Sequence, residues 1–155
     1  ILFVATPGED RAPRLSRDAR YLAYATDTSG RSEVYVRTCP PCRPDLDLND
    51  RTWRISRGGG SAPVWSHDGR EILFLAGRRV MSARVSTDPS FEAEPPEPLF
   101  ETDHVEDPFG NQNYDVAPDG RLIMIRAPRD DESRHRSQVV LSWGAALEAR
   151  VGSGR

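Results

Sequence analysis

The sequence of 155 residues contains no lysine, so all 21 positive charges are arginines, balanced against 24 acidic residues for a net charge of −3. Proteins that bind nucleic acid through phosphate contacts normally carry a clustered positive excess, and this balance argues against that class. Long apolar runs are also absent. The stretch Ile72–Ala76 is far shorter than the ~18 residues of a membrane span. We therefore expect no nucleic-acid partner and no membrane contact within this segment.

Cysteine is scarce, and both residues fall in Cys39-Pro40-Pro41-Cys42. This spacing occurs in redox and zinc sites, but a predicted strand precedes it and no second cysteine pair accompanies it. Two alternatives stay open: a loop with free thiols, or a local disulfide. His67, His104 and His135 fall in three different loops without metal-ligand spacing. We expect no metal and no cofactor.

What the sequence does contain is an internal repeat. Three segments align without gaps and place Asp18, Asp68 and Asp119 about 50 residues apart. In each, an apolar residue leads into a turn of the type Ser-x-Asp-Gly, and apolar residues then resume. Asp accepts hydrogen bonds from the backbone two residues on, and Gly supplies a positive φ, so the pair predicts a tight hairpin rather than a metal site. The predicted turn residues are Ser16, Asp18, Ser66, Asp68, Gly69, Asp119 and Gly120.

The first copy departs from this pattern, because Ala19 stands where the others have glycine. An alanine there should strain a left-handed position or force a different turn. Between the turns, short runs of β-branched and aromatic residues predict strands. They cover residues 21–26, 33–37, 53–56, 71–76, 80–85, 122–126 and 138–143. The links Asp27–Gly30 and Ala76–Arg78 are natural hairpin connections.

Helical patterning is nearly absent. One short amphipathic helix is predicted at 143–151, where Trp143, Ala146, Leu147 and Val151 share one face. Four-stranded units of 40 to 50 residues with an Asp-containing turn are typical of propeller blades, and closed propellers have 4 to 8 blades. The predicted fold is all-β: a partial β-propeller over residues 1–155 of about three four-stranded antiparallel blades, with turns near 16–20, 66–70 and 117–121.

These residues also carry a family resemblance. The segment Trp65-Ser66-His67-Asp68-Gly69-Arg70-Glu71-Ile72-Leu73-Phe74 resembles the blade motif of TolB-like, WD-repeat-like propellers, and residues 16–20 and 117–121 match it less completely. The tail Gln138–Trp143, followed by a short helix, is similar to the end of bacterial proteins in which such a propeller follows a serine/threonine kinase domain or a winged-helix regulator. The first residue is not Met and Ile1–Val4 reads as a strand, so we expect further blades or an upstream domain.

The resemblance implies a non-catalytic module for protein interaction or ligand sensing, at the C-terminal end of a larger bacterial signalling protein. It would lie outside the cytoplasm if it follows a membrane-anchored kinase. Two alternatives remain: the propeller that gates a prolyl-oligopeptidase-like serine peptidase, and a free periplasmic TolB-like binding protein. The polar tract 102–113 is either a plain connection or a partner-binding loop. Its candidate contact residues are Asp107, Phe109, Asn111, Gln112 and Asn113.

Overall fold

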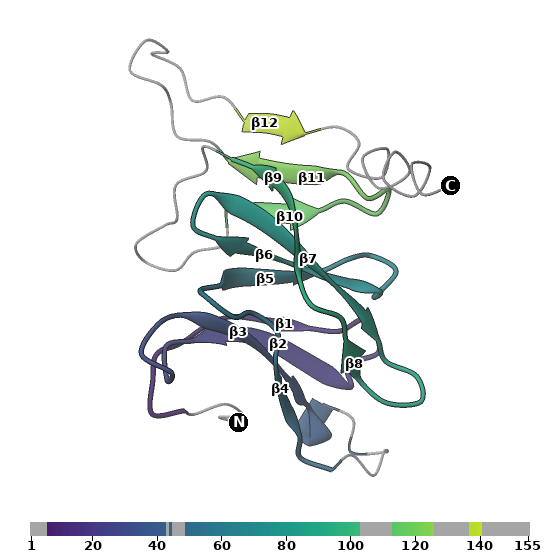
Figure 1. The fold of residues 1–155 in the computed structure, drawn as a ribbon. Helices are drawn as coiled ribbons and strands as arrows, with labels where there is room; N and C mark the ends of the chain where they lie inside the picture. The colour runs from purple at the N-terminus through teal and green to yellow at the C-terminus, as the bar shows by residue number, and fades with distance from the viewer. Residues whose placement is uncertain (1–5, 43, 45–48, 103–112, 126–136, 141–155) are drawn as a thin grey trace, which may run out of the picture.

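The computed structural model describes residues 6–42, 44, 49–102, 113–125 and 137–140. These residues form antiparallel β-sheets and one 3-10 turn, η1 (Pro40–Cys42), and contain no α-helix. None of the segments described is a helix long and apolar enough to cross a membrane. The sheets lie one above another (Figure 1). The predicted all-β, antiparallel fold is confirmed, and the stack is consistent with a partial propeller. The predicted helix 143–151 lies outside the described residues.

Each repeat forms one sheet. The first has the order β1 (Asp10–Leu15), β2 (Tyr21–Thr26), β3 (Glu33–Thr38), β4 (Thr52–Arg54). The second contains β5 (Ser61–Trp65), β6 (Glu71–Ala76), β7 (Arg79–Ser86), β8 (Glu92–Ala93) and β9 (Glu97–Glu101), with β8 and β9 both pairing with β7. The third contains β10 (Tyr114–Val116), β11 (Leu122–Ile125) and β12 (Ser137–Val140).

Strands β2 and β6 coincide with the predicted ranges 21–26 and 71–76. The first strand of each sheet, by contrast, was predicted only as a short apolar lead into the turn. In β1 and β5 this strand is broken by a bulge at an Ala-Pro pair, and Ala12 and Ala62 both have φ 49°. The bulge interrupts the alternation of side chains, which is why these strands do not show a clear period of two.

The middle sheet is buried on both faces. Ile72 and Phe74 pack toward the first sheet, whereas Leu73 and Leu75 pack toward the third. A strand covered on both faces needs apolar side chains at every position, so β6 shows a continuous apolar run instead of alternation. Between the first and second sheets the core also includes Tyr21, Ala23, Val34, Val36, Trp65, Val85 and Phe91.

A buried carboxylate joins the first sheet to the link that follows it. Glu33 on β3 is fully buried, and it accepts hydrogen bonds from Arg54 Nη2 at 2.6 Å, from the backbone N–H of Gly58 at 3.0 Å, and from the Ser56 hydroxyl. Burial by itself raises the pKa of Glu33, but these donors outweigh burial and hold it below its ordinary value. The carboxylate thereby fixes the chain as it passes toward the second sheet.

The third hairpin differs from the other two by one residue. Leu15 lies opposite Leu22 and Trp65 opposite Ile72, but Val116 lies opposite Leu122 where the repeat would place Ile123. In the first two turns a serine hydroxyl accepts the amide of Tyr21 or Glu71, five residues on. Ala117 stands at that position in the third copy and has no hydroxyl, and its N–H donates to the nearer carbonyl of Arg121. A one-residue slip exchanges the two faces of a strand.

Candidate functional site

The three Asp turns lie between the first two strands of their sheets. Asp18, Asp68 and Asp119 each accept a hydrogen bond from the amide two residues on, at 3.1 Å. Ser16 and Ser66 donate to their aspartates at 2.6 and 2.7 Å. The residue after each aspartate is left-handed: φ is 56° at Ala19, 72° at Gly69 and 80° at Gly120. The structure therefore accommodates alanine in the strained conformation and keeps the same turn.

Hydrogen bonds keep the pKa of each turn aspartate below its ordinary value. At Asp18, burial raises the pKa but donors from Ser16 and Arg20 outweigh it. At Asp68 the Ser66 hydroxyl is the largest cause of the lowering, and at Asp119 it is the Arg121 amide. These donors belong to the turns themselves. The aspartates thus close their hairpins. Within the part of the chain that the structure describes, no group of three His, Cys, Asp or Glu residues is placed to hold a metal ion.

The arginine that follows each turn behaves differently in the second sheet. Arg20 Nε lies 2.6 Å from Asp18 Oδ2, and Arg121 Nε lies 2.5 Å from Asp119 Oδ2. Among the described residues, Arg70 makes no such ion pair with its side chain, although its charge still acts on Asp68. Arg70 is one of the residues that line a cavity.

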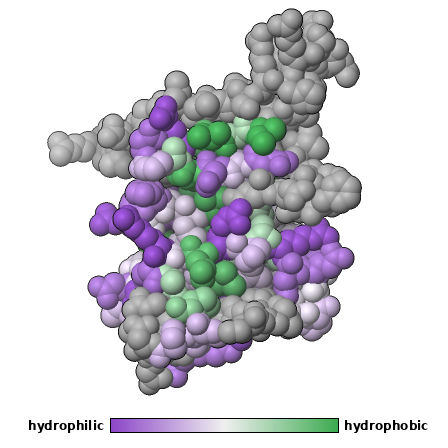
Figure 2. Space-filling view, turned by 180° about the vertical axis from the view of Figure 1, so that it is seen from behind, coloured by the Kyte–Doolittle hydropathy of each residue, from purple (hydrophilic) through white to green (hydrophobic). Residues whose placement is uncertain are grey.

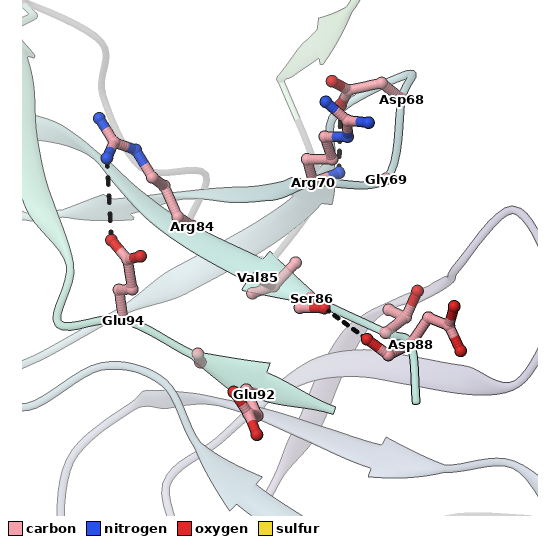
Figure 3. A pocket seen from close by; sticks show the side chains of 11 residues that line it. Asp68, Gly69, Arg70, Arg84, Val85, Ser86, Asp88, Glu92 and Glu94 are labelled. Atoms are coloured by element: carbon pink, nitrogen blue, oxygen red, sulfur yellow. Dashed lines mark hydrogen bonds and ion pairs between the residues drawn. The ribbon is translucent and has the colours of Figure 1, made fainter. Parts of the chain in front are cut away.

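This cavity of about 630 Å³ lies at the turn end of the second sheet. Three segments form it: the turn 68–70, the end of β7, and the segment from Thr87 through β8 to Glu94. Figure 3 shows Arg70 and Asp68 on one side of it, Arg84 and Glu94 on another, and Glu92 and Asp88 on β8 and the preceding loop. Most of its lining side chains are charged.

The ion pair at the cavity, between Arg84 and Glu94, is long and exposed to solvent. Arg84 Nη1 lies 3.9 Å from Glu94 Oε2, and the two side chains are 55% and 67% exposed. An exposed pair at this distance contributes little to stability, so both groups can reorient toward a ligand. The hydroxyl of Ser86 donates to the backbone carbonyl of Asp88 at 3.1 Å, so this hydroxyl is not paired with a base.

The outer wall of the cavity is tied to the first sheet. Arg20 Nη2 donates a hydrogen bond to the backbone carbonyl of Thr87, which lines the cavity. The backbone carbonyl of Arg20 in turn accepts the N–H of Cys39, at 2.8 Å. Cys39 and Cys42 form a disulfide around η1, so the structure selects the second of the two alternatives left open by the sequence. Through these contacts the first repeat fixes the position of the Thr87 backbone at the edge of the cavity.

A smaller cavity, about 210 Å³, separates the second and third turns. His67, Glu71 and Gly120 line it, and His67 is exposed. Burial raises the pKa of Glu71, and the hydroxyl of Ser82, which donates to Glu71 Oε2 at 2.8 Å, opposes that rise. Its histidine and carboxylates are not grouped as metal ligands.

Of the five candidate residues in the predicted partner-binding loop, the structure describes only Asn113. Asp107, Phe109, Asn111 and Gln112, together with His104 and His135, lie outside the described residues. Asn113 is described, and its backbone carbonyl accepts the N–H of Ile125 at 2.8 Å. Sequence reasoning missed Arg84, Glu92 and Glu94, because the cavity forms only when β7 and β8 fold against the turn. The sequence offers one signal for this site: Arg70 stands at the repeated arginine position that follows each turn.

Comparison with known proteins finds similar chains among solved structures. No family model and no curated protein matches the chain. Among solved structures, TolB from Acinetobacter baumannii is similar with 12% sequence identity and a TM-score of 0.35 over 88% of this chain. The match spans 42% of that TolB chain, less than half its length. The description of the fold therefore rests on the sheets themselves.

Proposed function

We propose that this chain is a non-catalytic binding module that holds a segment of a partner protein in the cavity beside Arg70. The observation that carries the proposal is the cavity of about 630 Å³ lined mainly by charged side chains. Pockets for small molecules are lined mainly by apolar and aromatic side chains with a few polar groups, whereas six of the eleven residues that line this cavity are charged. A polar peptide segment with charges of both signs fits it better.

The lining gives each charge of such a segment a partner. Arg70 presents a planar guanidinium that can bind a carboxylate through two parallel hydrogen bonds. Asp88 and Glu92 stand on the other sides of the cavity and can accept hydrogen bonds from a basic side chain. The sheets hold these groups on strand ends and turns, where rigid elements present them at fixed positions. Holding a peptide through ion pairs and hydrogen bonds involves no chemical step, which agrees with a non-catalytic module.

The finer prediction, that the module is the C-terminal part of a kinase-like bacterial signalling protein, rests on the sequence resemblance alone. A sensing or interaction role is compatible with a charged cavity on a rigid stack. The partner and the parent protein stay predictions.

The test is to probe an array of short synthetic peptides of acidic, basic, mixed and apolar composition with the full chain. The strongest binders are then measured by fluorescence anisotropy against the wild type and Arg70→Gln. We expect mixed-charge peptides to bind, and Arg70→Gln to weaken their binding at least about tenfold, because a hydrogen bond to a charged group contributes about 1.5–3 kcal/mol. Arg121→Gln is the matched control, since Arg121 occupies the same repeat position but pairs with Asp119.

Equal weakening by Arg70→Gln and Arg121→Gln would show a general charge effect and would contradict the proposed site. Binding of apolar peptides alone would contradict the proposed partner chemistry. Unfolding curves for all three proteins check that neither substitution changes stability.

A further inference from the structure

Two cavities of this chain lie on either side of one side chain. Asp68 lines both the cavity of about 630 Å³ beside Arg70 and the smaller one of about 210 Å³ between the second and third turns. Figure 2 shows the molecule from behind, with strongly hydrophilic residues along its left-hand edge, and this is the edge at which the turns lie in Figure 1. A ligand in the large cavity therefore has a second polar cavity within reach, past Asp68.

A row of alternating charges crosses the second sheet between these cavities. Glu71 on β6 lies directly opposite Arg84 on β7, and the carbonyl of Arg84 accepts the N–H of Glu94, the residue after β8, at 2.9 Å. Directly opposite residues of an antiparallel pair share one face of the sheet, and Arg84 Nη1 lies 3.9 Å from Glu94 Oε2. Arg84 is thus placed between two carboxylates, of which Glu71 lines the small cavity and Glu94 the large one.

The carboxylates that line the small cavity are only partly hydrogen-bonded. The bonds that Asp68 accepts from the Ser66 hydroxyl and from the Arg70 amide both end on Oδ1, and the bond that Glu71 accepts from Ser82 ends on Oε2. In the first and third turns, by contrast, Oδ2 of the aspartate pairs with the arginine two residues on. Among the described residues no arginine forms an ion pair with Asp68 or Glu71. Burial raises the pKa of Glu71, so a cation beside it would stabilise its charged form.

We propose that the small cavity binds a basic side chain of the same partner segment, two positions along that segment from an acidic residue bound by Arg84 and Arg70. This inference rests on the proposed function, since it takes the peptide in the large cavity as given. Opposite residues of an antiparallel pair are ~4.5–5.5 Å apart at Cβ, and residues two apart in an extended peptide are ~6.6 Å apart on one side of the chain. One intervening residue therefore sets the two charges against Glu71 and Arg84, whereas adjacent residues would point to opposite sides.

The third turn forms the far wall of the small cavity, and its amides are bonded within the turn. The N–H of Gly120 donates to the carbonyl of Ala117 at 2.9 Å, and the N–H of Arg121 donates to Asp119 at 3.1 Å. A basic side chain needs acceptors, and the carboxylates that line this cavity belong to the second repeat. The second repeat therefore recognises both charges of the segment.

The test is fluorescence anisotropy of the full chain with three synthetic peptides of equal length. The first carries a basic and an acidic residue with one residue between them, the second carries the same two residues adjacent, and the third has glutamine in place of the basic residue. Glu71→Gln should raise the dissociation constant of the first peptide at least about tenfold, because it replaces a charged acceptor with a neutral amide, and should leave the third unchanged. Glu101→Gln is the matched control: this exposed carboxylate pairs with Arg79 at the other end of β7, and its loss should change no binding.

The third peptide tests the same contact in the unaltered protein, where it should bind at least about tenfold more weakly than the first. The inference is overturned if the first and third peptides bind alike, if Glu71→Gln weakens both equally, or if the second peptide binds as tightly as the first. When Arg70→Gln still weakens the first peptide in those cases, the proposed function stands without this inference. When no peptide binds, or Arg70→Gln has no effect, the proposed function fails with it. Thermal unfolding verifies that the variants are folded.

Discussion

The indole Nε1 of Trp65 donates a hydrogen bond to the backbone carbonyl of Arg14 at 3.0 Å, which ties the first strand of the second sheet to the first strand of the first. The third sheet is tied in a similar way, because the hydroxyl of Tyr114 donates to the carbonyls of Ala62 and Leu73. Trp65 stands where the other repeats have Leu15 and Val116. The junctions between sheets thus rely on aromatic side chains that carry a polar tip.

Trp65→Phe should lower the free energy of unfolding by about 1–3 kcal/mol, because it removes the donor to Arg14 and part of the core volume. Tyr114→Phe isolates the polar contribution, since it keeps the ring and removes only the hydroxyl; we expect about 1 kcal/mol. Urea unfolding measures both. Unchanged stability in Tyr114→Phe would show that the hydroxyl does not hold the second and third sheets together.

The left-handed positions of the turns allow a reciprocal exchange. A non-glycine residue in this conformation costs about 1 kcal/mol or more, so Ala19→Gly should stabilise the protein slightly, by about 0.5 kcal/mol after the entropy of the unfolded glycine is included. Gly69→Ala is the reverse change and should destabilise the protein by about 0.5 kcal/mol, because the same two effects act with opposite sign. A Cβ at Gly69 would meet no atom within 4 Å, so backbone conformation alone decides the result. Thermal unfolding of both variants tests the pair, and shifts of the same sign would contradict the account.

Acid should weaken the protein partly through Glu33. Its pKa in the folded state lies below the ordinary value, so its contribution is present above the ordinary pKa of about 4.3 and is lost as the pH falls through the lowered value. Glu33→Gln should cost about 2–3 kcal/mol at neutral pH, where it loses the charge-assisted bonds to Arg54 and Ser56. The difference from the wild type should shrink in acid. Urea unfolding at neutral and acidic pH measures it, and a difference independent of pH would contradict the role of the charge.

The strand register of the third hairpin should change when a hydroxyl is introduced at position 117. Ala117→Ser restores the group that accepts an amide five residues on in the other two turns, and we expect Val116 to move opposite Ile123. Nuclear Overhauser contacts between the two strands report the register directly. Ser66→Ala is the converse change and should destabilise the second hairpin by about 1 kcal/mol. Persistence of the Val116–Leu122 pairing in Ala117→Ser would show that something other than the hydroxyl sets the register.

Much of the fold could be predicted, because the repeat carries it locally. Asp68 and Gly69 fix a turn by themselves, and the apolar run of β6 marks a strand buried on both sides. The bulges at Ala12 and Ala62 could not be predicted, since neither alanine nor proline indicates a positive φ. The slip in the third hairpin is a property of how its two strands pair, and the sequence shows only the change from serine to Ala117 that accompanies it.

The candidate site was less accessible to sequence reasoning. Arg70 looks like any other turn arginine in the sequence, and only the pairing of Arg20 and Arg121 with their aspartates distinguishes it. The opposite wall comes from β8, a strand of two residues with no periodic signal. A cavity built from such short pieces depends on tertiary packing, whereas the predicted loop at 107–113 was chosen for its polar composition alone.

Hydrogen exchange on the complex with the best-binding peptide tests the central claim most directly. Because the cavity lies between the turn and β8, the account predicts slower exchange of backbone amides in residues 68–70 and 84–94, and unchanged exchange in the equivalent turn at 119–121. Protection confined to the third sheet or to the turn at 18–20, with residues 84–94 unaffected, would contradict it.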